Sequence, residues 1–197
     1  MRVADPDSST LPGPPSAWNV ANALTLTRIA LVPLFGWLLL GDGGDNDLLR
    51  ILAFATFALA MATDKVDGDL ARSRGLETNV GKVADPIADK ALTGAAFIGL
   101  SILELLPWWV TMLVLFREIG ITLLRFAVIR HGVMPASRGG KIKTTLQAVA
   151  LSLYVLPLPA GFEPVQISIM AVTVAVTVVT GLDYVAQALR MRQGHAT

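Results

Sequence analysis

Long apolar runs alternate with short polar segments along this chain. Six such runs lie at about residues 24–40, 48–72, 80–105, 108–129, 141–158 and 165–189. Each has about the 17–25 residues that an α-helix needs to cross the hydrocarbon core of a bilayer. The segments between them, such as GDGGDND at 41–47, carry the glycines, prolines and charges of turns. The pattern predicts an all-α integral membrane protein with six transmembrane helices.

The segment before the first apolar run has a different pattern. In AWNVANALTLT at 17–27, apolar and polar residues alternate at helical spacing, and Trp18 is typical of the headgroup region of a membrane. We expect a short interfacial helix that leads into the first span. Residues 1–16 are rich in Pro, Ser and Asp, which predicts a disordered tail. The expected division is therefore a tail at 1–16, one membrane domain at 17–190 and a cytoplasmic tail at 191–197.

Composition agrees with a membrane protein and excludes several other classes. Only 16% of the residues are charged and the mean hydropathy is +0.60, whereas a soluble domain carries about 25% charged residues. The net charge of +1 gives no basis for nucleic-acid binding. The chain has no cysteine, which excludes a thiolate metal site and a cysteine nucleophile.

The distribution of Lys and Arg predicts the orientation. If the six runs cross the membrane in turn, the loops and span ends on the side of the two termini carry nine cations: Arg72, Arg74, Lys82, Arg130, Arg138, Lys141, Lys143, Arg190 and Arg192. The connections on the other side carry only Arg50. By the positive-inside rule, both termini of this multi-pass protein are expected on the cytoplasmic side of the cell membrane.

Four carboxylates lie where two adjacent antiparallel spans meet the cytoplasm. Asp64 and Asp67 are three residues apart, and Asp85 and Asp89 are four apart, so each pair shares one helix face. A charge at the centre of a membrane helix costs about 2.5–3.5 kcal/mol, and four facing acids repel unless cations lie between them. Oxygen ligands without His or Cys suit Mg²⁺ or Mn²⁺, and a pair of such ions suits phosphoryl transfer. The alternative is that these are ordinary acids at helix ends.

Small residues and a cation accompany the acids. Gly68 and Ala71 leave room for a ligand against the backbone, and Arg72 has the geometry to bind a phosphate through two donors. This predicts a phosphate-bearing ligand beside the carboxylates.

A second set of charges lies on the fourth and fifth spans. Glu118 and Arg125 share a helix face, whereas Arg117 points about 100° away from Glu118. With Lys141 and Lys143 at the cytoplasmic start of the fifth span, these residues predict a site for a small phosphorylated molecule. Two other interpretations stay open: the lysines are positive-inside anchors, and Arg117 is a structural partner of Glu118 or of a neighbouring span. Arg28 on the first span has a similar alternative, in which it extends to lipid headgroups.

The acid-rich segment carries a family signature. The pattern D-x2-D-G-x2-A-R-x8-G-x3-D-x3-D is matched at Asp64, Asp67, Gly68, Ala71, Arg72, Gly81, Asp85 and Asp89. It resembles the signature of the CDP-alcohol phosphotransferase family. The resemblance implies that family's six-span fold and two divalent ions, Mg²⁺ or Mn²⁺, held by the four aspartates on the pyrophosphate of a CDP-linked lipid. It also implies that Asp89 is the general base and that Gly68, Ala71, Arg72 and Gly81 line the CDP-lipid pocket.

Three further stretches narrow the resemblance. These stretches resemble parts of bacterial phosphatidylglycerophosphate synthases: NALTLTRIALVP at 22–33, REIGITLLR at 117–125 and GGKIKTTLQ at 139–147. The residues in and around them are most like those of actinobacterial members. This implies transfer of the phosphatidyl group of CDP-diacylglycerol to sn-glycerol 3-phosphate, with release of CMP, in phospholipid biosynthesis. Arg117, Arg125, Lys141 and Lys143 would bind the acceptor phosphate, and Asn22, Thr25, Arg28 and Glu118 are further site candidates.

The sequence leaves alternatives for the function, and it leads to one expectation for the oligomeric state. Within the family, a cardiolipin synthase and a phosphatidylinositol phosphate synthase are the alternatives. A divalent-cation transporter is the alternative from another class, although a transporter favours acids at the bilayer midplane rather than at one end. The family resemblance also makes a homodimer an expectation.

Overall fold

Six α-helices make up most of the described chain. The computed structural model describes residues 20–74, 79–128 and 138–193, without the side chains of 20–24, 64–74, 79–86, 89, 125–128, 138 and 192–193. The helices are α1 Val20–Leu40, α2 Asp47–Arg74, α3 Asn79–Ile102, α4 Trp108–Val128, α5 Arg138–Val155 and α6 Glu163–Gln193, with a short 3₁₀ helix, η1 Gly41–Gly44, after α1. The all-helical prediction is confirmed for this part of the chain.

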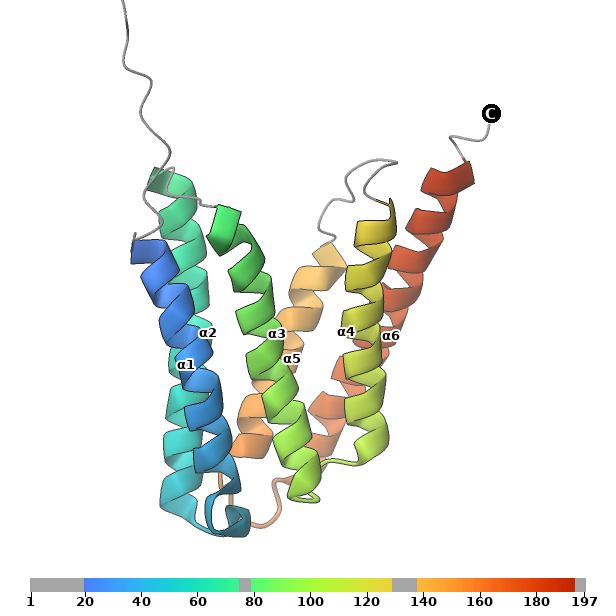
Figure 1. Cartoon of the computed structure of the whole chain (residues 1–197). Helices are drawn as coiled ribbons and strands as arrows, with labels where there is room; N and C mark the ends of the chain where they lie inside the picture. Colours follow the sequence, from blue (N-terminus) through green and yellow to red (C-terminus); the bar gives the residue numbers. More distant parts are fainter. Residues whose placement is uncertain (1–19, 75–78, 129–137, 194–197) are drawn as a thin grey trace, which may run out of the picture.

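The helices run up and down in two groups of three (Figure 1). One group consists of α1 packed against α2 and α3, and the other of α6 packed against α4 and α5. Helix α5 also packs against α2 and α3, and α3 against α4, which joins the groups. The groups lie close together at the end with the connections η1, 103–107 and 156–162, and they diverge toward the other end. That other end holds the last turns of α2 and α4 and the first turns of α3 and α5.

The apolar core lies where the two groups are in contact. Phe35 of α1 and Phe57 of α2 are fully buried, with ring centroids 5.6 Å apart, and they pack with buried residues of the other four helices. A small residue permits the close approach of α1 and α3: a Cβ on Gly99 would lie 2.7 Å from Cδ2 of Leu39. Small residues at helix contacts are typical of membrane helix packing.

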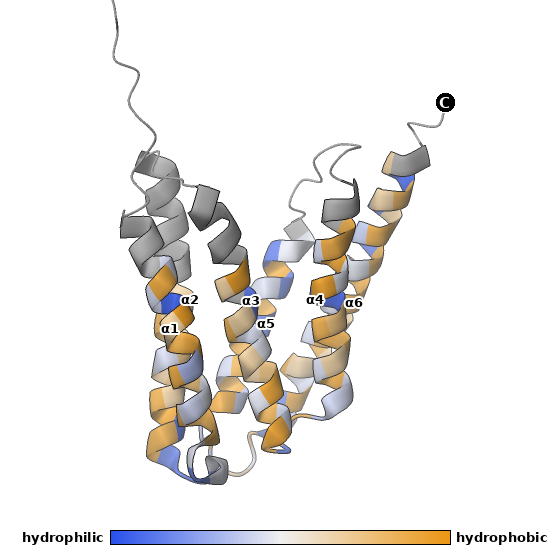
Figure 2. Cartoon of the chain, viewed as in Figure 1, coloured by the Kyte–Doolittle hydropathy of each residue, from blue (hydrophilic) through white to orange (hydrophobic). Residues whose placement is uncertain are grey.

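The outward faces of the bundle are also apolar (Figure 2). Large hydrophobic side chains on them include Trp37, Trp109, Phe116, Leu123 and Leu182, and Phe116 is 83% exposed. Soluble monomers rarely expose contiguous apolar patches larger than a few hundred Å². This surface therefore suits contact with lipid.

Two segments of the described residues are long and apolar enough, by length and composition, to cross a membrane. They are Thr25–Gly44 and Glu163–Met191, with mean hydropathies of 1.3 and 2.0. The count of six transmembrane spans stays a prediction.

The helix limits differ from the predicted ones mainly at the ends. The residues expected to form an interfacial helix belong, from Val20 onward, to the first turns of a continuous α1, and 17–19 lie outside the described residues. Helix α3 ends at Ile102 rather than near 105, because Glu104 adopts a left-handed φ of 57° and the amides of Leu105 and Leu106 both donate to Leu100 O. The predicted domain division stays a prediction.

Arg50 has a structural role that its position in a connection did not predict. Its Nε donates to the carbonyl oxygen of Val155 at 3.0 Å, and Nη2 donates to the carbonyl of Tyr154. These are among the last carbonyls of α5, which have no partner within the helix. Arg50 therefore caps the end of α5 from the start of α2.

Candidate functional site

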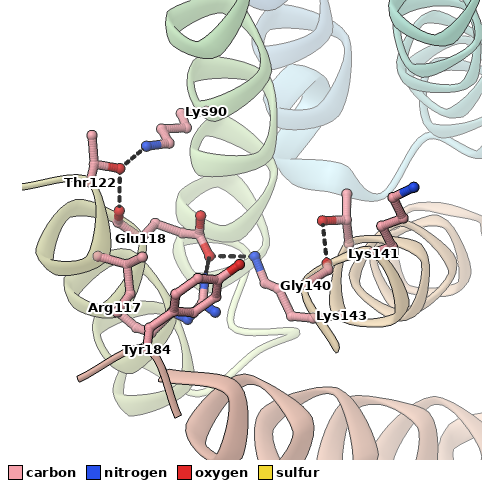
Figure 3. A pocket seen from close by; sticks show the side chains of 10 residues that line it. Lys90, Arg117, Glu118, Thr122, Gly140, Lys141, Lys143 and Tyr184 are labelled. Carbon is pink, nitrogen blue, oxygen red and sulfur yellow. Dashed lines mark hydrogen bonds and ion pairs between the residues drawn. The ribbon is translucent and has the colours of Figure 1, made fainter. Parts of the chain in front are cut away.

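A cavity of about 270 Å³ is lined by side chains of α3, α4, α5 and α6 (Figure 3). The described residues that line it are Lys90, Arg117, Glu118, Ile121, Thr122, Gly140, Lys141, Lys143, Thr144 and Tyr184. Four of these residues were predicted to belong to an acceptor site: Arg117, Glu118, Lys141 and Lys143. The fold brings these four to one cavity, although 22 residues of chain lie between Glu118 and Lys141.

Glu118 connects two cations that come from different helices. Its Oε1 accepts a hydrogen bond from Nη1 of Arg117 at 2.9 Å and another from Nζ of Lys143 (Figure 3). The Lys143 side chain is only 6% exposed and the Glu118 side chain 19%. Burial of a charge is tolerated when the charge is paired and hydrogen-bonded. The alternative that Lys143 is a positive-inside anchor is therefore wrong. Lys141 is exposed, so both interpretations of this residue, as an anchor and as part of the site, stay predictions.

Arg117 reaches from α4 to α6. Its Nη2 donates to Oγ1 of Thr180 at 3.0 Å, and its guanidinium carbon lies 5.8 Å from the centroid of the Tyr184 ring. A cation over an aromatic face at this distance is stabilising. Arg117 starts about 100° away from Glu118 on the helix, yet its long side chain bends back to pair with it. It is therefore a structural partner of both Glu118 and a neighbouring helix, and it also lines the cavity.

Gly181 makes room for the stem of Arg117. A Cβ at this position would lie 3.3 Å from Cγ and 3.6 Å from Nε of Arg117. This role of Gly181 was not predicted, because a glycine in an apolar helix is typical of many helix contacts.

We expect Gly181→Leu to displace the Arg117 guanidinium and to raise the KM of the anionic acceptor by about tenfold. The matched control is Gly120→Leu on α4, because a Cβ on Gly120 would meet nothing within 4 Å. Kinetics of both purified variants check the prediction. Equal KM values in the two variants would contradict the role assigned to Gly181.

Lys90 and Thr122 also belong to the polar lining, and neither was predicted from the sequence. Nζ of Lys90 donates to Oγ1 of Thr122, and this hydroxyl donates to the backbone carbonyl of Glu118 at 2.7 Å (Figure 3). Lys90 directly follows Asp89 in α3, so the cavity adjoins the helix that carries two of the predicted metal ligands. The available signal was a lysine immediately after the last acid of the signature.

The cavity lining has a strong excess of positive charge. Among the described lining residues, the four cations Lys90, Arg117, Lys141 and Lys143 and the one carboxylate Glu118 give a formal net charge of +3. Lysine and arginine are the residues that bind phosphate groups in proteins. The arrangement is therefore suited to a small anion with more than one negative charge.

Thr25 and Arg28 lie elsewhere, on α1. Their side chains are 2% and 1% exposed, and α1 packs against α2 and α3. The alternative that Arg28 extends to lipid headgroups is wrong, because its side chain is buried inside the bundle. Neither residue lines the cationic cavity.

The family signature itself is described only as backbone. Asp64, Asp67, Gly68, Ala71 and Arg72 belong to α2, Gly81, Asp85 and Asp89 to α3, Asn22 to α1 and Arg125 to α4, and the side chains of all ten lie outside the described residues. Both acid-bearing segments are helical, as the argument from three- and four-residue spacing requires. The predicted metal ligands and the role of Arg125 stay predictions.

Comparisons with known proteins agree with the signature. The family model described as CDP-alcohol phosphatidyltransferase matches residues 18–179. A probable phosphatidylglycerophosphate synthase of Mycobacterium tuberculosis is 51% identical to this chain, over 95% of the chain and 90% of that protein. A CDP-diacylglycerol–glycerol-3-phosphate 3-phosphatidyltransferase of Bacillus subtilis is 38% identical, over 85% of the chain and 93% of that protein.

A relative with a different name matches less of the chain. A CMP-forming cardiolipin synthase of Streptomyces coelicolor is 35% identical over 59% of the chain and 54% of that protein. The family model covers most of the chain, and the two longer alignments cover nearly all of the relatives concerned. This chain therefore belongs to the CDP-alcohol phosphatidyltransferase family.

Proposed function

We propose that this protein is a phosphatidylglycerophosphate synthase. It transfers the phosphatidyl group of CDP-diacylglycerol to sn-glycerol 3-phosphate and releases CMP. The observation that carries the choice of acceptor is the cavity beside α3, whose described lining residues have a formal net charge of +3. Relatives at 51% and 38% identity whose names state this activity support the same choice.

We assign the donor side of the reaction to the signature residues. Asp64, Asp67, Asp85 and Asp89 would hold two divalent ions, because their donors are carboxylate oxygens, which Mg²⁺ and Mn²⁺ prefer over nitrogen and sulfur. Such ions, when bound, neutralise the pyrophosphate and the charge that develops on the departing CMP. The remaining signature residues, Gly68, Ala71, Arg72 and Gly81, would line the pocket for the CDP-lipid.

The chemical step needs one proton acceptor from the protein. Asp89 takes the proton of the 1-hydroxyl group of glycerol 3-phosphate, and that oxygen forms a bond to the phosphorus attached to diacylglycerol. The bond from this phosphorus to the CMP oxygen breaks, and CMP leaves with the electron pair. Arg72 offers charge-assisted hydrogen bonds to the phosphates.

We assign the acceptor phosphate to the cationic cavity. Lys141 and Lys143 would bind it, with Arg117 held beside them by Glu118 and with Arg125 as a further proposed contact. A phosphomonoester carries close to two negative charges at neutral pH, as phosphorylated side chains do. A phosphodiester such as phosphatidylglycerol carries one. The excess of three positive charges therefore favours glycerol 3-phosphate over the acceptor of a cardiolipin synthase.

The proposal extends to where the protein is located in the cell and to its oligomeric state. The apolar outer surface and the distribution of Lys and Arg support a multi-pass protein of the cell membrane, with both termini and the site facing the cytoplasm. Asn22, Thr25 and Arg28 are proposed for the donor side, since α1 packs against α2 and α3. A homodimer stays a prediction.

A panel of acceptors tests the function. The purified protein in lipid nanodiscs is given labelled CDP-diacylglycerol with glycerol 3-phosphate, phosphatidylglycerol, an inositol phosphate or glycerol, with and without Mg²⁺ or Mn²⁺. We expect CMP release only with glycerol 3-phosphate and a divalent ion. Release with phosphatidylglycerol or inositol phosphate instead would identify one of the two alternative synthases. Turnover without a divalent ion would contradict the metal assignment, and cation flux into proteoliposomes without CDP-lipid would favour a transporter.

A further inference from the structure

Lys90 differs from the other cations of the cavity in the helix that carries it. Arg117 belongs to α4, and Lys141 and Lys143 belong to α5, whereas Lys90 belongs to α3. It is the residue after Asp89, the proposed base. Adjacent residues of a helix are separated by a rise of only about 1.5 Å. Lys90 lines the cavity, and it belongs to the helix that carries the proposed base for the acceptor hydroxyl.

Lys90 also differs in its counter-charge. Arg117 and Lys143 share the carboxylate of Glu118, whereas the hydrogen bond that Lys90 makes within the described residues goes to a neutral hydroxyl, that of Thr122 (Figure 3). An ammonium group has three hydrogen-bond donors, and one hydroxyl uses one of them. Among the described residues no carboxylate pairs with Lys90, so its charge and its other donors are available to a ligand in the cavity.

Thr122 holds Lys90 at the cavity wall. Its hydroxyl accepts from Lys90 while it donates to the carbonyl of Glu118 at 2.7 Å, one turn earlier in α4. The same turn of α4 carries the carboxylate that binds Arg117 and Lys143. One turn of α4 therefore holds cations from α3, α4 and α5 at the wall of the same cavity.

We propose that Lys90 is a specificity-determining residue that binds the acceptor phosphate from the α3 side, and that Thr122 is its positioning residue. This inference rests on the proposed function. With the phosphate held between Lys90 and the cations of α4 and α5, the free hydroxyl of the acceptor is presented to α3. A polyol without a phosphate has no group for Lys90 to bind and is rejected.

Kinetics of the full-length protein in nanodiscs test this assignment. We expect Lys90→Met to raise the KM of glycerol 3-phosphate by about 10- to 100-fold, as for the loss of a hydrogen bond between charged groups, and to leave the KM of CDP-diacylglycerol within about twofold. We expect Lys90→Arg to restore the acceptor KM to within about fivefold of the wild-type value. A smaller rise, of about threefold, is expected for Thr122→Val.

Thr56→Val is the matched control for Thr122→Val. Oγ1 of Thr56 donates to the carbonyl of Leu52 at 2.8 Å, the same bond one turn back that Thr122 makes, but outside the cavity. We expect wild-type kinetics from it. If Thr56→Val changes the acceptor KM as much as Thr122→Val does, the positioning role of Thr122 is overturned.

Two results would overturn the role of Lys90: an unchanged acceptor KM in Lys90→Met, or an equal rise in the KM of both substrates. Lys90→Gln takes its place if the methionine variant does not fold. Isothermal titration of the same proteins with inorganic phosphate and with glycerol 3-phosphate distinguishes a failure of the Lys90 assignment from a failure of the proposed function. A wild-type protein that turns over only another acceptor contradicts the function. Equal phosphate affinity in wild type and Lys90→Met contradicts the assignment of Lys90.

Discussion

Replacing Asp89 with Asn is expected to lower the rate of CMP release by at least about 100-fold. A positioned general base contributes about 10²- to 10⁴-fold to catalysis, and an amide accepts no proton at neutral pH. Asp89 is in addition a proposed metal ligand, so the substitution also weakens a carboxylate set built for divalent ions. The expected signature is a large loss of kcat at saturating concentrations of both substrates and of Mg²⁺.

Asp183→Asn is the control for this prediction. Asp183 is an exposed acid of α6, and its Oδ2 accepts a hydrogen bond from Nε2 of Gln187 at 2.8 Å. We expect it to keep wild-type activity. CMP release from CDP-diacylglycerol, followed with labelled donor at several Mg²⁺ and Mn²⁺ concentrations, measures both variants. An Asp89→Asn variant with full activity would contradict the assignment of the base.

Replacing Lys143 with Met is expected to affect both stability and acceptor binding. Lys143 is 6% exposed and binds Oε1 of Glu118, so its removal leaves a largely buried carboxylate that, among the described residues, pairs only with Arg117. Breaking a buried ion pair on one side typically costs about 3–5 kcal/mol. Because Glu118 is 19% exposed, we expect the lower part of that range. We also expect the KM of glycerol 3-phosphate to rise by about 100-fold.

A double variant separates the two effects of Lys143. In Lys143→Met/Glu118→Gln no unpaired carboxylate remains, so thermal unfolding in nanodiscs should return toward the wild-type midpoint. The acceptor KM should stay high, because the cation is still missing. Arg190→Gln, an exposed cation of α6, is the control and should change neither quantity. If the double variant recovers both stability and acceptor KM, Lys143 has only a structural role.

Local sequence features predicted the helices well. The apolar runs predicted six helices, and in the described residues six are present, with ends that differ by a few residues. Hydropathy and turn residues act over short distances along the chain, so they are readable without a fold. Where a helix end depended on a single backbone conformation, as at Glu104, or where two predicted elements merged, as at Val20, the prediction was less accurate.

The site was predicted in part. The spacing of the acids within α2 and α3 follows from helix geometry alone, and the polar residues of α4 and α5 stood out because charges are rare in apolar helices. Lys90, Thr122, Gly181 and Tyr184 were missed, since each is unremarkable within its own helix. Arg50 was likewise read as a residue of an outer connection, whereas it caps α5.

By itself the sequence determined the all-helical architecture, the family and the position of the acids in two consecutive helices. Periodicity and spacing are properties of a single helix, and the signature is a local pattern. The tertiary structure alone decided which cations meet. Arg117 leaves its own helix face to pair with Glu118 and Thr180, and Lys143 and Lys90 join it from two other helices. Such contacts depend on how helices pack and how far long side chains reach, and neither is encoded in the spacing along one helix.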